Sequence, residues 1–182
     1  MPTQEPRPRH DQVRRQQRPD PAHGIGALLA RLRAVRALTP RQVTNDWYAA
    51  RNSLTHRTLG PISTATIMMS FSGMLDGDRA GFGLLRDQSA YIGVWRSGST
   101  YTLNMVNGMT MSSTWTTTST GSTAASAALS GSTVFLRIIA DVTTGGDSAT
   151  FWYSTSGASG SFKQLGPAFK CDTNWQFFEG QR

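Results

Sequence analysis

The stretch from residue 73 to residue 96, GMLDGDRAGFGLLRDQSAYIGVWR, constrains the fold more than any other part of the chain. Asp76-Gly77-Asp78 is typical of a tight turn, because Gly and Asp tolerate turn geometry. A second polar turn is expected at 87–89. The segments 79–86 and 89–96 lie on either side of it, and the second is rich in the aromatic and β-branched side chains that favour a pleated surface. The stretch therefore predicts an antiparallel β-hairpin.

Short strand patterns recur through the rest of the chain from residue 47 onward, separated by glycines and polar clusters. This pattern predicts an all-β sandwich or barrel. The Ser/Thr-rich stretch 112–133 interrupts the series, and we expect it to be a long connection, either functional or mobile. The expected strands are 53–59, 62–72, 79–86, 89–96, 100–107, 133–142, 148–154 and 161–169, with a last apolar group at 174–178.

The positive charge of the chain is concentrated at its start. Residues 1–41 hold nine basic and three acidic residues, a net charge of +6 out of the total of +7. We predict that residues 1–41 form a disordered tail rich in Arg and Pro, since they have few apolar side chains to bury. Residues 25–38 have apolar side chains at helical spacing and are consistent with a short amphipathic helix. Charge in such a tail does not indicate a nucleic-acid-binding face, so no nucleic-acid partner is expected.

The sequence contains neither a candidate membrane span nor a recognisable signal peptide. The chain has no apolar run long enough to cross a bilayer, so no membrane partner is expected. Its first residues lack the apolar region of a secretory signal peptide. The single Cys171 permits no internal disulfide and leaves the compartment open.

Several stretches together resemble one known family. They are the hairpin at 73–96, WYAARNSLTHRTLGPISTATI at 47–67, YTLNMVNGMTMSSTW at 101–115, ATFWYSTSG at 149–157 and LGPAF at 165–169. As a set they resemble the C-terminal domain of glycoside hydrolase family 43, the β-xylosidase and arabinanase group. The resemblance implies a concanavalin A-like jelly-roll β-sandwich over 47–182, packed against a catalytic β-propeller. It also offers an alternative for residues 25–38, because family members carry a strand-like segment just before the stretch that begins at Trp47.

The resemblance leads us to expect an incomplete domain. The family pattern continues beyond WQFFEGQR, so the last strand or two of the sandwich are expected to be missing. An unpaired edge and an exposed core face would follow. The three acidic residues of a family 43 propeller have no counterpart upstream of Trp47. The chain therefore looks like a truncated product without its catalytic domain.

The acidic residues do not form a recognisable catalytic pair, which inverting glycoside hydrolysis requires. Most lie at expected strand ends and in Gly-flanked turns, where Asp binds local backbone donors. Asp141 shares a strand face with Arg137, so an ion pair is expected there. Asp76-Gly77-Asp78 resembles the start of a calcium loop but lacks the later ligands. We predict no catalytic residues, no metal site and no cofactor; the carboxylates considered are Asp76, Asp78, Asp87, Asp141, Asp147, Asp172 and Glu179.

Aromatic residues are the better site candidates, since sugars stack on flat rings. Strand alternation places Trp152 on a polar face, opposite Phe151. Tyr91 and Trp95 share another face, with Gly93 between them expected to leave the backbone open. By resemblance, Phe178 matches a Phe that narrows the propeller's active-site pocket in relatives acting on xylo-oligosaccharides. The alternative for each of these aromatics is packing in the core or at the propeller interface.

The sequence therefore favours a non-catalytic accessory domain that braces the propeller of a polysaccharide-degrading enzyme and contributes an aromatic to its pocket. One alternative is a stand-alone carbohydrate-binding module for xylan or arabinan oligosaccharides. Another is a gene fragment with no function of its own. Family relatives are often secreted, but the chain itself carries no such signal.

Overall fold

The computed structural model describes residues 44–171. The chain divides into two compact units, Met1–Leu38 and Thr39–Arg182, and every described residue belongs to the second. The predicted tail at 1–41, the 25–38 segment and the apolar group at 174–178 lie outside the described residues. Within 44–171 the regular structure is β-strand apart from one short 3-10 turn, Ser159–Ser161. This agrees with the predicted all-β class.

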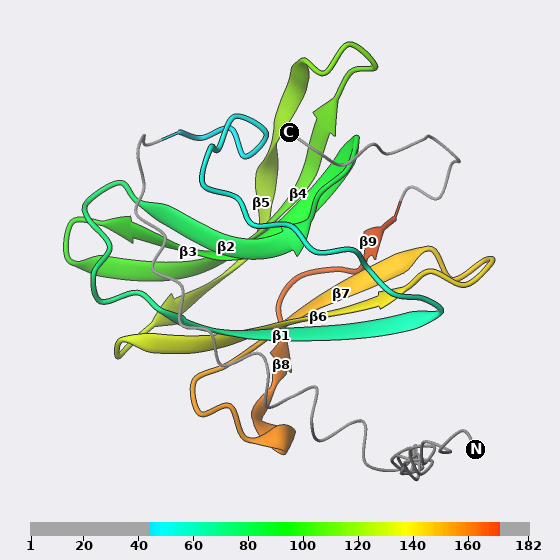
Figure 1. The fold of residues 1–182 in the computed structure, drawn as a ribbon. Coiled ribbons are helices and arrows are strands. Elements are labelled where there is room, and N and C mark those ends of the chain that lie inside the picture. Colours follow the sequence, from blue (N-terminus) through cyan, green and yellow to red (C-terminus); the bar gives the residue numbers. More distant parts are fainter. Residues whose placement is uncertain (1–43, 172–182) are drawn as a thin grey trace, which may run out of the picture. The chain divides into compact units, whose positions relative to one another are not determined.

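The first of two antiparallel sheets, sheet B, has the strand order β2-β3-β4-β5. Its strands are β2 (Arg79–Leu84), β3 (Gln88–Ser97), β4 (Thr100–Met111) and β5 (Thr117–Leu129). β2 and β3 form the predicted hairpin, with Arg79 opposite Trp95 and Leu84 opposite Ala90. The turn before it is also confirmed: Asp78 N donates to Leu75 O, and Gly77 adopts a φ of 83°. The four strands of sheet B are labelled in Figure 1.

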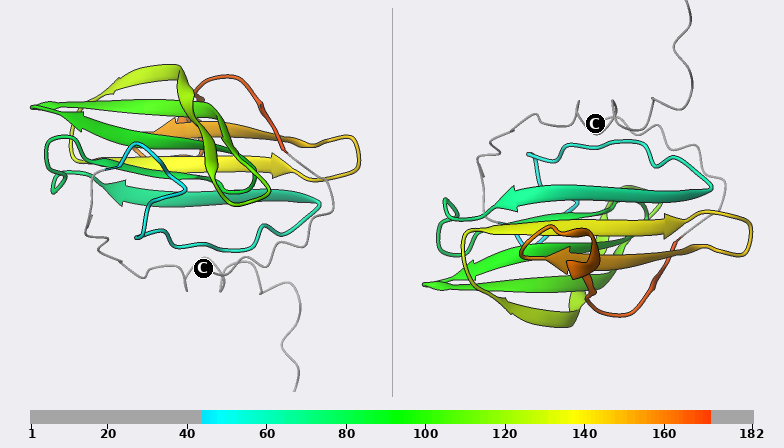
Figure 2. Two further views of the ribbon diagram at one scale, coloured as in Figure 1. Left: turned by 90° about the horizontal axis from the view of Figure 1, so that it is seen from above. Right: turned by 90° about the horizontal axis from the view of Figure 1, so that it is seen from below.

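The second sheet, sheet A, has the order β1-β6-β7-β8, and β9 also pairs with β7. Its strands are β1 (Ile62–Ser70), β6 (Thr133–Asp141), β7 (Ser148–Ser154), β8 (Lys163–Gln164) and β9 (Phe169–Lys170). β1 and β6 are distant in sequence but pair along their whole length, from Ile62 opposite Asp141 to Ser70 opposite Thr133. Figure 2 shows the two sheets as stacked layers, as in a concanavalin A-like sandwich.

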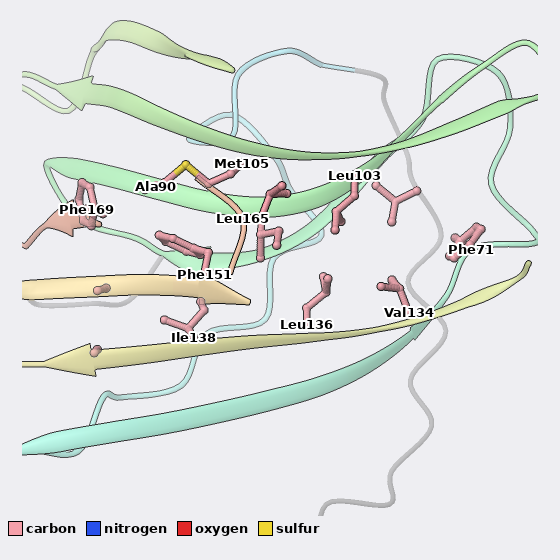
Figure 3. Packing of buried hydrophobic residues seen from close by; sticks show 14 residues of the cluster. Phe71, Ala90, Leu103, Met105, Val134, Leu136, Ile138, Phe151, Leu165 and Phe169 are labelled. Carbon is pink, nitrogen blue, oxygen red and sulfur yellow. The ribbon is translucent and has the colours of Figure 1, made fainter. Parts of the chain in front are cut away.

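The core lies between the sheets and follows from strand alternation. In β6, Val134, Leu136 and Ile138 are buried while the residues between them are partly exposed. In β3 and β4 the matching inward positions include Ile92 and Leu103, both fully buried. Figure 3 shows these apolar side chains meeting between the layers, with Phe151 and Phe169 among them. Burial of apolar surface on this scale is the main stabilising contribution to the sandwich.

One predicted connection and one predicted strand are wrong. The Ser/Thr-rich stretch expected to be a connection contains β5, a 13-residue strand paired with β4. The apolar side chains of β5 that pack against the core are Ala125, Ala127 and Leu129, and two of these are small, so the hydrophobic alternation of this strand is too weak to be recognised in the sequence. Residues 53–59 were expected to be a strand but form no ladder, and the whole segment from Arg51 to Ile62 is exposed.

The region predicted as one strand at 161–169 is divided. β8 and β9 are two-residue strands that pair with opposite ends of β7, at Trp152–Tyr153 and Ser148–Ala149. Gly166, with a φ of 78°, lies between them and lets the chain change direction. The two short pieces therefore replace one continuous strand.

Candidate functional site

The outer face of sheet B brings together the predicted pair Tyr91 and Trp95. Both are half-buried, and Trp95 Nε1 donates a hydrogen bond of 3.2 Å to the Tyr91 hydroxyl. The predicted open backbone between them is wrong. A Cβ on Gly93 would lie 3.1 Å from the Tyr91 ring, and one on Gly81 would lie 2.9 Å from it. The glycines therefore make room for the tyrosine ring, which covers them.

Arg79 completes this cluster from the neighbouring strand. Its guanidinium carbon lies 3.9 Å from the centroid of the Trp95 ring, a cation–π stack between directly paired residues. This contact was not predicted from the sequence, although the register of the hairpin places Arg79 directly opposite Trp95. Burial raises the pKa of Tyr91 and outweighs the opposing effects of Trp95 and Arg79, so the phenol stays protonated at neutral pH. We call Arg79, Tyr91 and Trp95 the sheet B cluster.

Polar groups lie next to the sheet B cluster on the following strands. Asn104, opposite Gly93, is buried, and its Oδ1 accepts a 2.6 Å hydrogen bond from the exposed Ser126 of β5. Asn104 Nδ2 donates to the carbonyl of Thr102 at 3.3 Å. An amide and a hydroxyl therefore accompany the aromatic rings, a combination suited to polyhydroxylated ligands.

A loop that the sequence analysis did not assign to a site covers the other end of the same face. The Trp47 ring lies 5.3 Å from the Tyr91 ring, and a Cβ on Gly83 would come within 2.5 Å of it. The Tyr48 hydroxyl donates to the carbonyl of Arg86 at 3.0 Å and lies 3.2 Å from that of Asp87. Burial is the main cause that raises the pKa of Tyr48. The only sign of this contact in the sequence is the aromatic dipeptide Trp47-Tyr48, which lies outside the predicted strands.

Asp46 connects the loop that carries Trp47 and Tyr48 to strand β5 of sheet B. Its Oδ1 accepts from Tyr48 N at 3.0 Å, and its Oδ2 accepts from the Thr117 hydroxyl of β5 at 2.7 Å. The loop from Thr44 to Ala50 therefore holds both ends of the sheet, β2–β3 and β5. We call it the Trp47 loop.

The outer face of sheet A carries Trp152, on the side opposite the buried Phe151 as predicted. Trp152 is partly exposed, and its Nε1 donates to the Thr150 hydroxyl at 2.8 Å. Its cross-strand neighbour Arg137 stacks on Phe162, with the guanidinium carbon 3.6 Å from the ring centroid. Arg137 also donates to the Thr66 hydroxyl at 2.9 Å. The rings are thus separate from the sheet B cluster, on the other layer.

The acidic side chains whose contacts are described next accept hydrogen bonds from nearby turns. Asp78 Oδ2 accepts from Leu75 N and Asp76 Oδ1 from Gly98 N, both at 2.6 Å. The predicted ion pair between Asp141 and Arg137 is wrong: Asp141 accepts from the backbone and hydroxyl of Thr143, which lower its pKa. Asp172, Glu179 and Phe178 lie outside the described residues.

No group of three or more metal-ligating side chains occurs among residues 44–171. In the same range there is no helix long and apolar enough to cross a membrane. Cys171 is half-buried, and burial is the main cause that raises its pKa, with Asp147 adding to it. A shallow depression beside it is lined by residues 145–148 and 168–170, without a cluster of reactive groups.

Two solved structures with similar folds are described as GH43 proteins. One is described as a GH43 glycoside hydrolase engineered at its active site to display both endo-xylanase and exo-arabinofuranosidase activity. It is 39% identical with a TM-score of 0.70, and the match covers 75% of this chain and 27% of that one. A bifunctional GH43-CE protein of Bacteroides eggerthii has a TM-score of 0.63 at 24% identity, over 75% of this chain and 16% of its own, which shows a shared fold.

This chain thus spans about a quarter of the first of these enzymes and a smaller share of the second. No curated protein is detectably similar to it. The family model for the β-xylosidase C-terminal concanavalin A-like domain matches residues 30–181, which includes all of the described sandwich. The chain belongs to this family of glycoside hydrolase family 43 C-terminal domains.

Proposed function

We propose that this chain acts as the non-catalytic sandwich domain of a family 43 glycoside hydrolase and braces a catalytic propeller. The observation that carries the proposal is the 39% identity to about a quarter of a GH43 enzyme with reported endo-xylanase and exo-arabinofuranosidase activity. Since the match covers only this quarter of the enzyme, the rest of that enzyme is the part that a sandwich domain of this kind would contact and stabilise. By the same relationship, the polysaccharide of the complete enzyme would be xylan or an arabinose-substituted relative.

The segment 51–62 is the surface we assign to propeller contact. Twelve consecutive residues are exposed there, including Leu54 at 68%, Leu59 at 57% and Ile62 at 61%. Met68, on the adjoining strand β1, is 63% exposed. Large apolar side chains that stay exposed along this irregular segment and on β1 are typical of a surface that a partner covers. Covering all four would contribute several kcal/mol, at about 1.5–3 kcal/mol for each fully buried side chain.

The proposal is tested by adding the domain to a propeller in trans. The catalytic region of the 39%-identical enzyme, prepared without its own matching domain, would be titrated with this chain by isothermal titration calorimetry. We expect saturable binding and a rise in the melting temperature of the propeller. Leu54→Ser with Leu59→Ser should weaken binding at least tenfold. Leu75→Ser is the matched control, because Leu75 is 71% exposed but lies outside the segment.

Absence of binding at high micromolar concentrations would count against bracing. Binding that the double substitution leaves unchanged would instead relocate the interface away from 51–62. The finer suggestion that Phe178 contributes to the propeller's pocket is part of the same proposal. Phe178→Ala should then alter the KM of the reconstituted enzyme for xylo-oligosaccharides without preventing domain binding.

A second candidate function is weak carbohydrate binding. The specific observation in its favour is the sheet B cluster with Asn104 and Ser126 beside it, rings and an amide on one face. Trp152 on sheet A is a further candidate, since its ring is partly exposed beside Thr150 and Arg137. Stacking and a few wet hydrogen bonds would give millimolar affinity, roughly 3–5 kcal/mol. Binding of xylan or arabinan oligosaccharides by fluorescence or NMR titration tests it.

A further inference from the structure

We propose that Arg79 and the Tyr91 hydroxyl form a carboxylate-binding site that selects a uronic acid unit on the polysaccharide. The inference rests on the second candidate function above, carbohydrate binding, and names the class of sugar. It concerns the outer face of sheet B, where Arg79 is exposed at the start of β2.

The guanidinium is held in place before any ligand arrives. It stacks on Trp95 at 3.9 Å, and the Trp95 ring is itself fixed by its hydrogen bond to the Tyr91 hydroxyl. A stacked guanidinium keeps its N–H donors in one plane at the ring surface. Because the guanidinium is already ordered, less side-chain entropy is lost when a ligand binds. Its planar array of N–H donors matches the two oxygens of a carboxylate.

The Tyr91 hydroxyl supplies a second donor. Since its oxygen accepts the indole N–H of Trp95, its own proton remains to be donated. The hydroxyl stays protonated at neutral pH because burial raises its pKa. Both donors contact the same Trp95 side chain, because Arg79 stacks on its ring at 3.9 Å and the Tyr91 hydroxyl is bonded to its Nε1, so one ligand can reach both.

The charge on this face is one-sided. The row that crosses the sheet at Arg79 continues through Trp95, Thr102 and Ala128, and the next row holds two glycines, an amide and a hydroxyl. Neither row contains an acidic residue. Asp78, next to Arg79 in sequence, is buried and accepts a hydrogen bond from Leu75 N. Within residues 44–171, no carboxylate therefore neutralises Arg79, and an anionic ligand is the complement.

A sugar acid fits the surroundings better than an acidic protein segment does. The strand next to Asn104 presents small side chains, Ser126 and Ala128, both exposed, so the surface is low and carries hydroxyls. Such a surface can accept a chain of hydroxylated rings. The uronate would place its carboxylate on Arg79 and its ring beside Tyr91.

The test compares two probes that differ in one carboxylate. Xylotetraose with a single glucuronic acid branch, and the same branched oligosaccharide with that carboxyl reduced to a primary alcohol, would be titrated into the full chain by NMR or calorimetry. We expect the acidic probe to bind about tenfold tighter, with a preference that declines as salt is raised. Arg79→Gln should remove the preference, and Tyr91→Phe should reduce it by a smaller factor while keeping the ring. Lys170→Gln, which removes one exposed positive charge on sheet A, should leave the preference intact.

Each alternative result has a distinct meaning. Equal binding of the two probes would overturn the uronate site and leave carbohydrate binding in place. Binding of neither probe by the folded chain would overturn carbohydrate binding and the uronate site together. A preference that survives Arg79→Gln would overturn the assignment to Arg79, as would equally tight, Arg79-dependent binding of an oligoglutamate peptide, which would indicate a protein partner. Circular dichroism of each variant checks folding, and Tyr91→Phe keeps the test decisive if Arg79→Gln does not fold.

Discussion

Gly83→Ala is expected to destabilise the sandwich by about 2 kcal/mol, because three groups already occupy the space for a side chain. A Cβ there would come within 2.5 Å of the carbonyl of Ala90, of Cβ of Tyr91 and of the Trp47 ring. The first two belong to the paired strand β3 and cannot yield without breaking the hairpin. Overpacking of this kind typically costs 1–3 kcal/mol.

The third obstacle makes the effect separable. The Trp47 ring can move, whereas the backbone cannot, so part of the cost should disappear when the ring is absent. In a double-mutant cycle with Trp47→Ala, we expect a coupling of about 1 kcal/mol that favours the double variant. For a unit of roughly 130 residues, a loss of about 2 kcal/mol corresponds to a melting temperature about 7 °C lower.

Urea denaturation followed by circular dichroism measures these free energies, and tryptophan fluorescence reports the displaced ring. Gly73→Ala is the control, since a Cβ on Gly73 meets nothing within 4 Å. It should change the free energy of unfolding by less than about 0.5 kcal/mol. A Gly83→Ala variant as stable as the control would refute the close approach of Trp47 and β3.

Three further predictions concern catalysis, the tail and Trp152. The purified chain should not hydrolyse nitrophenyl xylosides or arabinosides, and turnover that is lost on substitution of Asp76, Asp78 or another of its carboxylates would contradict this. Removal of residues 1–41 should lower the net charge by six and leave the β-sheet circular dichroism intact, whereas its cooperative loss would contradict the tail prediction. Trp152→Ala should abolish any fluorescence response to xylan or arabinan oligosaccharides at little cost in stability. A loss of about 3 kcal/mol would show that the ring is packing.

The parts of the fold that sequence predicts well are those with strong alternation. The hairpin of β2 and β3 combines turn residues at 76–78 with aromatic and β-branched side chains in β3, and both the turn and the pairing occur as expected. In β7 the alternation was clear enough to separate the inward Phe151 from the outward Trp152, whereas β6 was recognised as a strand although its outer face also carries Phe135 and Ile139. β5 fails this criterion, because its inward residues are mostly Ala and its outward ones Ser, Thr and Ala.

The candidate site was predicted only in part, for a related reason. Strand alternation places Tyr91 and Trp95 on one face, and the structure brings them into hydrogen-bonding contact. Strand alternation gives no information on which residues from other parts of the chain cover that face. Trp47 lies there because Gly83 leaves room for its ring, and Asp46 reaches Thr117, 71 residues away in sequence. Such contacts depend on how strands are brought together and have no local signature.

The central claim, that segment 51–62 meets a family 43 propeller, is tested most directly by hydrogen exchange. Apart from Ile62, the first residue of β1, the segment belongs to no strand ladder and its residues are exposed, so its backbone amides should exchange rapidly in the chain alone. With the catalytic region of the 39%-identical enzyme present in excess, we predict slowed exchange across 51–62 and unchanged exchange around Leu75. Exchange across 51–62 that remains as fast in the presence of the propeller as in its absence would contradict the account.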